Sequence, residues 1–272
     1  MLTILSVDKA DNGRLFPLKG KLEIHEEILA HTQVRFIRYI RRRGGIPWNK
    51  IEKAAGDERF VLCRESLEIP PDFSLGRFSC NELRVRLSLN MALAALEMGK
   101  DKSKAVNVGI YDLSGKIADS ADAFFKFTDS VTVVTKAVDL YGLQAQRIME
   151  EQGAHLRVTR KLMGLENAHI VVAPDELKCR LPLRKQAVIL TTRSPDILQN
   201  CTVLSKYHFV IENGVSDALP EGVDTEYFAS ALFTLEKRCY LGSLVPMAAK
   251  DGGFSHTLVS LSKYLTNIAS NT

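Results

Sequence analysis

The sequence predicts an α/β protein built on a parallel β-sheet, and three observations lead to this prediction. From about residue 105 to residue 211, short apolar runs of strand character alternate with segments of helical periodicity. The links between them are short, which is typical of parallel strands joined by helices that cover both faces of a sheet. The chain of 272 residues is also long enough for two domains of ordinary size.

Composition agrees with an ordinary globular chain. Hydrophobic residues make up 46% of the sequence and charged residues 25%, and the net charge is +4. This mild charge neither demands nor excludes a nucleic-acid partner, because such binding usually needs a concentrated basic face. We therefore expect a small-molecule or nucleotide ligand rather than nucleic acid, while a homo-oligomer is compatible with the sequence.

Cysteine usage and the hydropathy pattern bear on the compartment. The five cysteines are scattered, odd in number and never spaced as C-x-x-C, so they are expected to be reduced thiols in a cytoplasmic protein. The N-terminus has neither a basic region nor a long apolar run, so we expect no signal peptide. No window approaches the ~20 apolar residues of a membrane span, so no membrane partner is expected.

Residues 1–102 are predicted to form an N-terminal α/β domain. Its expected elements are a strand at 2–7, a helix at 22–43, a strand at 61–63 and a helix at 81–98. The helix at 22–43 is predicted because apolar residues from Ile24 to Ile40 recur at helical spacing. The helix at 81–98 is apolar nearly all round, which is typical of burial on more than one side.

Residues 103–222 are predicted to form the parallel-sheet domain. Its expected strands are 105–110, 131–135, 155–159, 169–173, 187–191 and one near 207–211. Helices are expected at 116–128 and 139–152, and Gly153 is a suitable C-cap for the second. Residues 223–272 are predicted to form C-terminal helices at 224–239 and 255–269, joined by a flexible link at 250–253, that pack between the domains or against the first one.

The turn after the first strand of this sheet is the place where a phosphate would bind. In a dinucleotide-binding domain, glycines in this turn let the backbone approach the pyrophosphate, and the helix N-terminus supplies free N–H groups. The turn here reads Y-D-L-S-G-K-I-A over residues 111–118 and resembles a G-x-x-G-x-x-G motif. Asp112 then takes the first glycine position, Gly115 the second and Ala118 the third.

Asp112 departs most from the motif, since its carboxylate would repel a phosphate. Two unit charges ~4 Å apart at an effective dielectric of ~20 repel by about 4 kcal/mol, which corresponds to roughly a thousandfold in affinity. Ser114 and Lys116 could offset part of this with a hydroxyl and a cation. The alternative is structural, with Asp112 or Ser114 capping the helix.

The end of the next strand is the second position that bears on a dinucleotide. NAD-binding domains present an acidic residue to the ribose hydroxyls there, about 20 residues beyond the turn. This chain has Thr135 and Lys136 instead, with no acidic residue before Asp139. If a dinucleotide binds, Lys136 favours the phosphorylated form, NADP; the alternative is a solvated lysine after a strand.

Residues 104–215 resemble the NAD(P)-binding Rossmann domain shared by shikimate-dehydrogenase-like and glutamyl-tRNA-reductase-like enzymes, with a degenerate glycine motif. The resemblance rests on the turn at 111–118 and covers under half of the chain. It implies a two-domain architecture and a ligand cleft outside the carboxyl ends of the strands, between this domain and the first. It carries over no catalytic residues.

Polar residues at the other strand ends supply the remaining candidates. Asp175 and Arg193 could face a substrate, and Asp175 or Glu176 could act as a general base. Adjacent residues on an extended chain point to opposite sides, so at most one of the two acids faces a ligand. No histidine pair has metal-ligand spacing, so no metal site is predicted.

The arginines at residues 35–43 form the one charge cluster of the chain. If residues 22–43 are helical, Arg35, Arg38 and Arg42 share a face that could bind nucleic acid. A solvated face is the alternative, because no recognition motif accompanies it.

Three hypotheses follow for function. The first is a two-domain protein that binds a nucleotide or small metabolite in the interdomain cleft as an NADP-dependent oxidoreductase, with Asp112, Ser114, Gly115, Thr135 and Lys136 around the cofactor. The second is a non-catalytic scaffold or sensor whose dinucleotide site is lost and which binds no such cofactor. The third is nucleic-acid binding through the helix face at residues 35–43.

Overall fold

The structure is a computed structural model that describes residues 1–9, 20–41, 45–212, 214–251 and 253–271. Contacts divide the chain into two compact units. The first unit consists of Met1–Leu83 and Val210–Leu241, and the second of Arg84–Phe209 and Gly242–Thr272. Each unit is described by itself.

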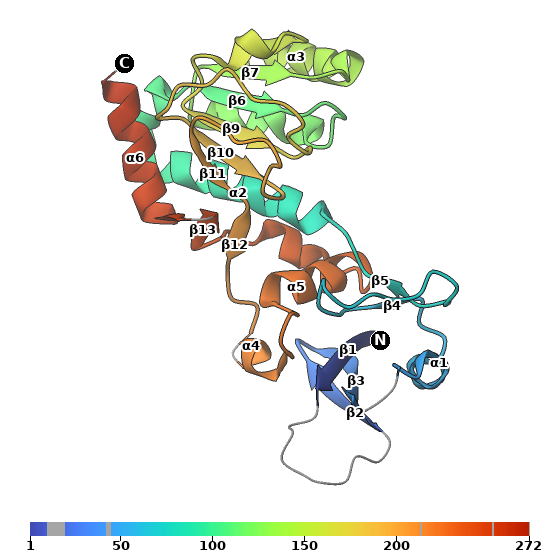
Figure 1. Ribbon diagram of the computed structural model, residues 1–272. Helices are drawn as coiled ribbons and strands as arrows, with labels where there is room; N and C mark the ends of the chain where they lie inside the picture. Colours follow the sequence, from blue (N-terminus) through green and yellow to red (C-terminus); the bar gives the residue numbers. More distant parts are fainter. Residues whose placement is uncertain (10–19, 42–44, 213, 252, 272) are drawn as a thin grey trace. The chain divides into compact units, whose positions relative to one another are not determined.

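A six-stranded parallel sheet forms the centre of the second unit (Figure 1). Its strands are β6 (Val108–Tyr111), β7 (Val131–Val134), β8 (Leu156–Thr159), β9 (Ile170–Ala173), β10 (Val188–Thr191) and β11 (Thr202–Leu204). Their spatial order is β11-β10-β9-β6-β7-β8, and every neighbouring pair is parallel. If β6 to β11 are numbered 1 to 6 in chain order, the strand order read from the β8 edge is 3-2-1-4-5-6, which is the order of dinucleotide-binding domains. The α/β, Rossmann-like fold predicted from the sequence is therefore confirmed.

Helical segments and an apolar loop cover the faces of this sheet. The segments η2 (Ala118–Lys126) and α3 (Val138–Gln152) contact each other. This contact is expected when two successive right-handed crossovers, from β6 to β7 and from β7 to β8, place their helices on the same face of the sheet. A separate apolar cluster joins Leu165 of η3 (Leu162–Leu165) to Leu177 and Leu181 of the segment between β9 and β10. That segment contains no helix, which agrees with its prolines at 174 and 182.

The second unit also contains a small antiparallel sheet and a C-terminal helix. Strands β12 (Lys206–His208), β13 (Ala248–Asp251) and β14 (Phe254–Thr257) pair in that order. The helix α6 (Leu258–Ser270) follows directly, with the Thr257 side chain accepting a hydrogen bond from the Ser260 N–H as N-cap. It contacts η1 (Lys100–Ala105).

Five strands build the sheets of the first unit. They are β1 (Leu2–Lys9), β2 (Lys21–Leu29), β3 (Thr32–Arg41), β4 (Phe60–Val61) and β5 (Gly76–Arg77). β3 lies between β1 and β2, and a bridge from Ile4 to Leu62 connects β1 to the β4–β5 pair. One face packs with α1 (Trp48–Ala55) in a core that includes Leu5, Ile37 and Ile51.

Two helices from the C-terminal part of the chain belong to the first unit. They are α4 (Val215–Ala218) and α5 (Thr225–Thr234). The Tyr227 hydroxyl donates to the Phe78 carbonyl at 2.6 Å, and the buried Phe228 lies in the same helix. α5 therefore returns to the N-terminal part of the chain, while α6 belongs to the second unit. The domain boundaries predicted at 102 and 222 stay a prediction.

The helix predicted at residues 22–43 is wrong. Residues 21–41 form the antiparallel hairpin of β2 and β3, whose turn places Ala30 at φ 47° and His31 at φ 58°. The apolar spacing was compatible with a helix, but the β-branched and aromatic residues of 32–41 pack on the two faces of a strand. Arg42 and Arg43 lie outside the described residues.

Several other elements differ from expectation. The helix predicted at 116–128 is the shorter 3₁₀ segment η2, and the helix at 81–98 is confirmed as α2 (Glu82–Gly99). Lys250 and Asp251 of the link predicted at 250–253 belong to β13, and residue 252 lies outside the described residues. The strand predicted near residue 207 is β12 in the antiparallel sheet. Among the described residues, no helix has the length and apolar character needed to cross a membrane.

Candidate functional site

The carboxyl ends of β6 and β9 mark the point where the strand order of the six-stranded sheet reverses. β6 runs to Tyr111, and its neighbour β9 runs to Ala173. In open α/β sheets the crevice outside the strands at such a point is where ligands bind. The loops at 112–117 and 174–176 therefore define the candidate site.

The carboxylate of Asp112 fills the turn that follows β6. Its Oδ1 accepts hydrogen bonds from the N–H groups of Gly115 at 2.8 Å and Lys116 at 3.0 Å. Its Oδ2 accepts from the Ile117 N–H at 2.9 Å and from the Tyr141 hydroxyl at 2.7 Å. The side chain is fully buried. Four donors thus converge on one carboxylate.

These three backbone N–H groups are the ones that a phosphate would use. They lie in the turn that leads into η2, and Ile117 is the N-cap of that segment. In a Rossmann domain the pyrophosphate sits at this place. Here the Asp112 carboxylate accepts hydrogen bonds from all three donors, and the roles expected for Asp112 stay predictions.

Tyr141 completes the arrangement from the neighbouring helix α3. Its ring is fully buried, and burial together with the Asp112 carboxylate raises the pKa of its hydroxyl above the ordinary value. The hydroxyl therefore stays protonated and donates to Asp112. The sequence analysis did not single out Tyr141, because no motif links a tyrosine in the second helix to the turn after the first strand.

Gly115 has the role that a turn glycine requires. Its φ is +81°, a conformation that L side chains rarely adopt. A Cβ atom there would lie 2.8 Å from Leu140 Cδ1 and 3.3 Å from Ala137 Cβ. Glycine is therefore required at position 115 for two reasons: the turn needs a positive φ there, and the backbone of the turn passes close to the start of α3.

Asp175 connects the loop after β9 to the loop after β6. It accepts hydrogen bonds from the Ser114 N–H at 3.0 Å and the Ser114 hydroxyl at 2.8 Å, and it pairs with Lys116 Nζ at 2.9 Å. Burial disfavours its charge, but the hydrogen bonds from Lys116 and Ser114 outweigh this and hold its pKa below the ordinary value. Asp175 is therefore an ionised carboxylate that joins the loop after β9 to the loop after β6.

Glu176 and Arg193 link β9 to its other neighbour. Arg193 follows β10 and forms an ion pair with Glu176, which also lies 3.9 Å from Lys178. The two adjacent acids thus point to opposite sides, as the sequence predicted. Asp175 and Arg193 lie on separate connections, and each is already paired with a residue of opposite charge.

Thr135 and Lys136 follow the end of β7, beside the turn. Thr135 is buried, and its hydroxyl accepts a hydrogen bond from the Ala137 N–H at 2.9 Å. Lys136 is exposed, and no ion-pair partner is found for it in the described part of the chain. Of the predicted cofactor residues, Lys136 alone offers an uncommitted charged group.

Tyr111 and Cys179 are a second pair that the sequence analysis missed. The Tyr111 hydroxyl lies 3.8 Å from Cys179 Sγ, within hydrogen-bond range for sulfur. Burial, and then the contact with Cys179, raises the pKa of Tyr111 to about 12. The pair borders the apolar cluster on one face of the sheet and belongs to its packing.

The arginines at residues 35–41 are not a basic helix face. Arg35 pairs with Glu26 at 2.8 Å and donates to the carbonyls of Ala54 and Ala55. Arg38 donates from Nε to Asp8 at 2.7 Å. These two arginines lie on a strand beside acidic partners, so the helix face predicted at residues 35–43 is wrong, while nucleic-acid binding itself stays untested.

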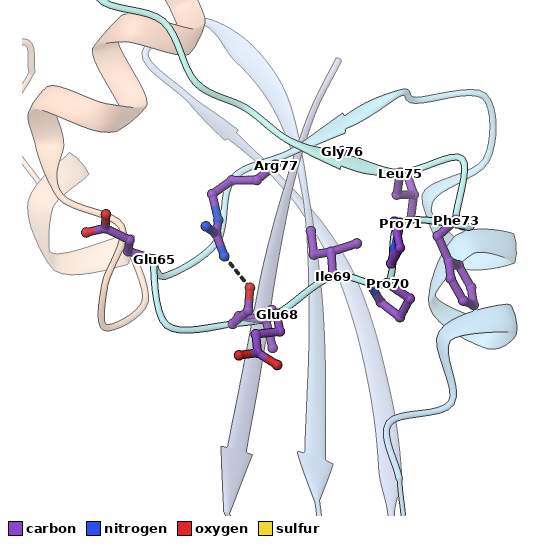
Figure 2. Close-up of a pocket in the computed structure, with 10 residues that line it drawn as sticks. Glu65, Glu68, Ile69, Pro70, Pro71, Phe73, Leu75, Gly76 and Arg77 are labelled. Carbon is purple, nitrogen blue, oxygen red and sulfur yellow. Dashed lines mark hydrogen bonds between the residues drawn. The ribbon is translucent and has the colours of Figure 1, made fainter.

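Two pockets lie in the first unit. One, of about 440 Å³, is formed by β5 and the connection that leads to it from β4, and Figure 2 shows the residues that line it. Ile69, Pro70 and Phe73 lie on one side of it, and the Arg77 guanidinium lies on the other. Arg77 is committed to structure, since it donates to the Leu67 carbonyl and its Nε lies 3.5 Å from Cys63 Sγ.

The other pocket, also about 440 Å³, lies on the β1-β3-β2 sheet beside the segment at 218–221. It is lined by charged and aromatic side chains from all three strands. No group of three or more His, Cys, Asp or Glu side chains among the described residues could hold a metal ion.

Comparison with known proteins gives weak structural similarity and no similarity in sequence. No family model matches the chain, and no curated protein matches it. The ligand-free form of 5-ketofructose reductase of Gluconobacter sp. strain CHM43 is 12% identical with a TM-score of 0.34, over 98% of this chain and 99% of that one. Shikimate dehydrogenase in complex with NADP⁺ is 11% identical with a TM-score of 0.30, over 87% of this chain and 85% of that one.

A third similar structure is Δ1-pyrroline-2-carboxylate reductase of Thermococcus litoralis in complex with NADH and L-proline. It is 11% identical with a TM-score of 0.30, and the match covers 40% of this chain and 34% of that protein's length. Of these structures, the shikimate dehydrogenase holds NADP⁺ and the pyrroline-carboxylate reductase holds NADH. Their TM-scores carry no argument about activity, and the fold of the second unit stands on its own strand order.

Proposed function

We propose that this chain is a non-catalytic binding protein, a scaffold or sensor, whose Rossmann unit has lost its dinucleotide site. One observation carries the proposal. The buried Asp112 carboxylate accepts the three N–H groups of Gly115, Lys116 and Ile117, and the Tyr141 hydroxyl holds it in place.

A pyrophosphate would have to displace this carboxylate or bind beside it. Displacement would remove four hydrogen bonds from a buried charge, and each hydrogen bond to a charged group contributes about 1.5–3 kcal/mol. Binding beside it would place two anions ~4 Å apart, which costs about 4 kcal/mol at an effective dielectric of ~20. The repulsion alone corresponds to roughly a thousandfold in affinity, and displacement adds the loss of the hydrogen bonds to Asp112.

The neighbouring charges support the same proposal. Lys116, which could have approached a phosphate, is paired with Asp175, and Arg193 is paired with Glu176. The carboxylates of Asp175 and Glu176 thus link the loop after β9 to the loop after β6 and to the loop after β10, respectively. The crevice at the reversal of strand order is thus crossed by contacts that hold these loops together.

A second candidate is an NADP-dependent oxidoreductase, and Lys136 is the observation that favours it. This lysine is exposed at the end of β7, where a dinucleotide-binding domain places the group that contacts the adenosine ribose. On this alternative Ser114, Gly115 and Thr135 would approach the cofactor. Asp175 or Arg193 would have to leave its ion pair to meet a substrate.

Calorimetric titration with NADPH and NADH separates the two candidates. We expect no saturable heat for the wild-type chain at ligand concentrations of about 1 mM. We expect Asp112→Gly to gain affinity for NADPH, because the variant frees three N–H donors and removes the charge. Asp129→Gly, in an exposed loop before β7, is the control and should bind no better than wild type.

Suppose that the wild-type chain binds NADPH saturably and that Lys136→Ala weakens this binding. That result would contradict the proposed loss of the dinucleotide site and would support the oxidoreductase candidate. Circular dichroism of Asp112→Gly before the titration ensures that folded protein is compared. If wild type and folded Asp112→Gly both fail to bind, the carboxylate of Asp112 is not what blocks the dinucleotide, and the explanation of the lost site by Asp112 is overturned.

A further inference from the structure

The pocket on the β1-β3-β2 sheet brings together residues that are far apart in sequence. It is lined by Ile4, Ser6 and Asp8 of β1, His25 of β2, Phe36 and Arg38 of β3, and residues of the segment at 218–221 that include Glu221. Its volume of about 440 Å³ falls in the range of small-molecule sites. All of these residues belong to the first unit, so the pocket is independent of the turn at Asp112.

Strand register explains why these side chains share one face. Ile4 pairs with Phe36, which pairs with His25 across the hairpin. Two residues beyond Ile4 on β1, Ser6 pairs with Arg38 of β3. Directly paired residues project to the same side of a sheet, and the residues between them project to the opposite core. The face therefore carries an apolar and aromatic row beside a polar row.

The aromatic row provides a flat surface. The rings of His25 and Phe36 are stacked, with centroids 4.7 Å apart and an angle of 4° between their planes. Ile4 and Phe36 are almost fully buried, while His25 is exposed. An apolar group of a ligand would find hydrophobic contact on this row.

The polar row and the segment beside it provide both signs of charge. Arg38 donates from Nε to Asp8 at 2.7 Å, and its Nη1 lies 4.0 Å from Glu23, so most of its five N–H donors are left for a ligand. Glu221 is exposed, and the described residues offer it no ion-pair partner. A guanidinium and an uncommitted carboxylate thus line the same small cavity.

We propose that this pocket binds a small zwitterion of the α-amino-acid class. The ligand's carboxylate meets the remaining donors of Arg38, its ammonium group meets Glu221, and its apolar side chain lies on the row formed by Ile4, Phe36 and His25. Recognition of both charges distinguishes such a ligand from a simple amine, which would meet Glu221 alone, and from a simple carboxylic acid, which would meet Arg38 alone.

The test uses the full chain and three ligands of the same shape. L-phenylalanine carries both charges, L-phenylalaninamide lacks the carboxylate, and N-acetyl-L-phenylalanine lacks the ammonium group. We expect calorimetry to show saturable binding of L-phenylalanine with a dissociation constant of about 1 mM or below. The other two ligands should bind at least about tenfold more weakly, since each loses a charge-assisted hydrogen bond.

Glu221→Gln should weaken the binding of L-phenylalanine by about tenfold, because a neutral amide replaces the carboxylate that meets the ligand's ammonium group. Glu212→Gln, at an exposed carboxylate of the same unit outside the pocket, is the matched control and should bind like wild type. The proposal is overturned if L-phenylalanine does not bind, if the amide binds as tightly as the amino acid, or if Glu221→Gln changes nothing. Failure of this test leaves the Asp112 proposal untouched, since that rests on a different unit.

Discussion

Asp112 is the residue on which the proposed loss of the dinucleotide site rests. Its carboxylate takes the three N–H donors that a Rossmann turn normally offers to a phosphate, and Tyr141 adds a fourth donor. Because the side chain is fully buried, each of these bonds is made away from competing water. These intrachain hydrogen bonds therefore stabilise the turn.

Asp112→Asn should destabilise the protein by about 2–4 kcal/mol, because an amide presents an NH₂ group where two oxygens now accept. The measurement is urea unfolding near neutral pH. Asp129→Asn, at an exposed aspartate, should stay within about 0.5 kcal/mol of wild type. Equal stability of the two variants would contradict the contacts described for Asp112.

His169 makes stability depend on pH. Its Nδ1 accepts from the Asn107 N–H at 3.0 Å, and burial, followed by the charge of Arg184, lowers its pKa below 6.5. His169 therefore binds a proton less readily in the folded state than in the unfolded state. The free energy of unfolding should consequently fall as the pH drops below about 6.5.

His169→Asn keeps an acceptor for the Asn107 N–H but cannot be protonated, so it should reduce this loss of stability. His155→Asn, at an exposed histidine, is the control. Urea unfolding at a series of pH values between about 5 and 8 makes the measurement. A wild-type chain that is equally stable across this range would rule out the role assigned to His169.

The sequence predicted part of this site. It placed Asp112 at the first glycine position of the turn and offered helix capping as its alternative role, since a short carboxylate beside an N-terminus is a typical cap. It could not find Tyr141 or the pairing of Asp175 with Ser114 and Lys116. Those contacts depend on which strands are neighbours, and β6 and β9 are far apart in sequence.

At the scale of elements, the hairpin of β2 and β3 was the main error. Its turn consists of Ala30 and His31, both at positive φ, without the asparagine or glycine that usually signals such a turn. Nothing in the sequence therefore interrupted the apparent helical spacing from Ile24 to Ile40. Pairing with β1 decided the structure, and this is a long-range contact.

His31→Gly tests the strain in this turn. Left-handed backbone costs an ordinary residue roughly 1–2 kcal/mol, and the greater freedom of glycine in the unfolded chain offsets part of the gain. We expect a net stabilisation of about 0.5 kcal/mol in urea unfolding. Glu27→Gly, within the strand, should instead destabilise by about 0.5–1 kcal/mol. Stabilisation of both variants, or of neither, would contradict this explanation of the turn.

The elements of the parallel sheet were predicted more successfully. Five of its six strands follow apolar runs that the sequence marked, because parallel strands buried on both faces read as continuous hydrophobic segments. β11 was missed, since Thr202–Leu204 has only three residues. The helix expected after β6 is 3₁₀ in the structure, and its turn is organised by Asp112.

For the whole molecule, strand order carries the conclusion about fold. The alternating pattern predicted a parallel sheet, and the order β11-β10-β9-β6-β7-β8 confirms it as Rossmann-like. The return of α5 to the N-terminal part of the chain, with α6 in the second unit, could not be derived from local pattern. It depends on tertiary contacts such as the one from Tyr227 to Phe78.

The central claim is that this Rossmann unit carries its own anion in place of a dinucleotide. The most direct measurement follows the backbone amide resonances of Gly115, Lys116 and Ile117 by NMR while NADP⁺ is added. We expect these three resonances to stay unchanged in the wild-type chain, because their N–H groups remain bonded to Asp112. Saturable shifts of all three on adding NADP⁺ would show that the cofactor displaces the carboxylate and would contradict the claim.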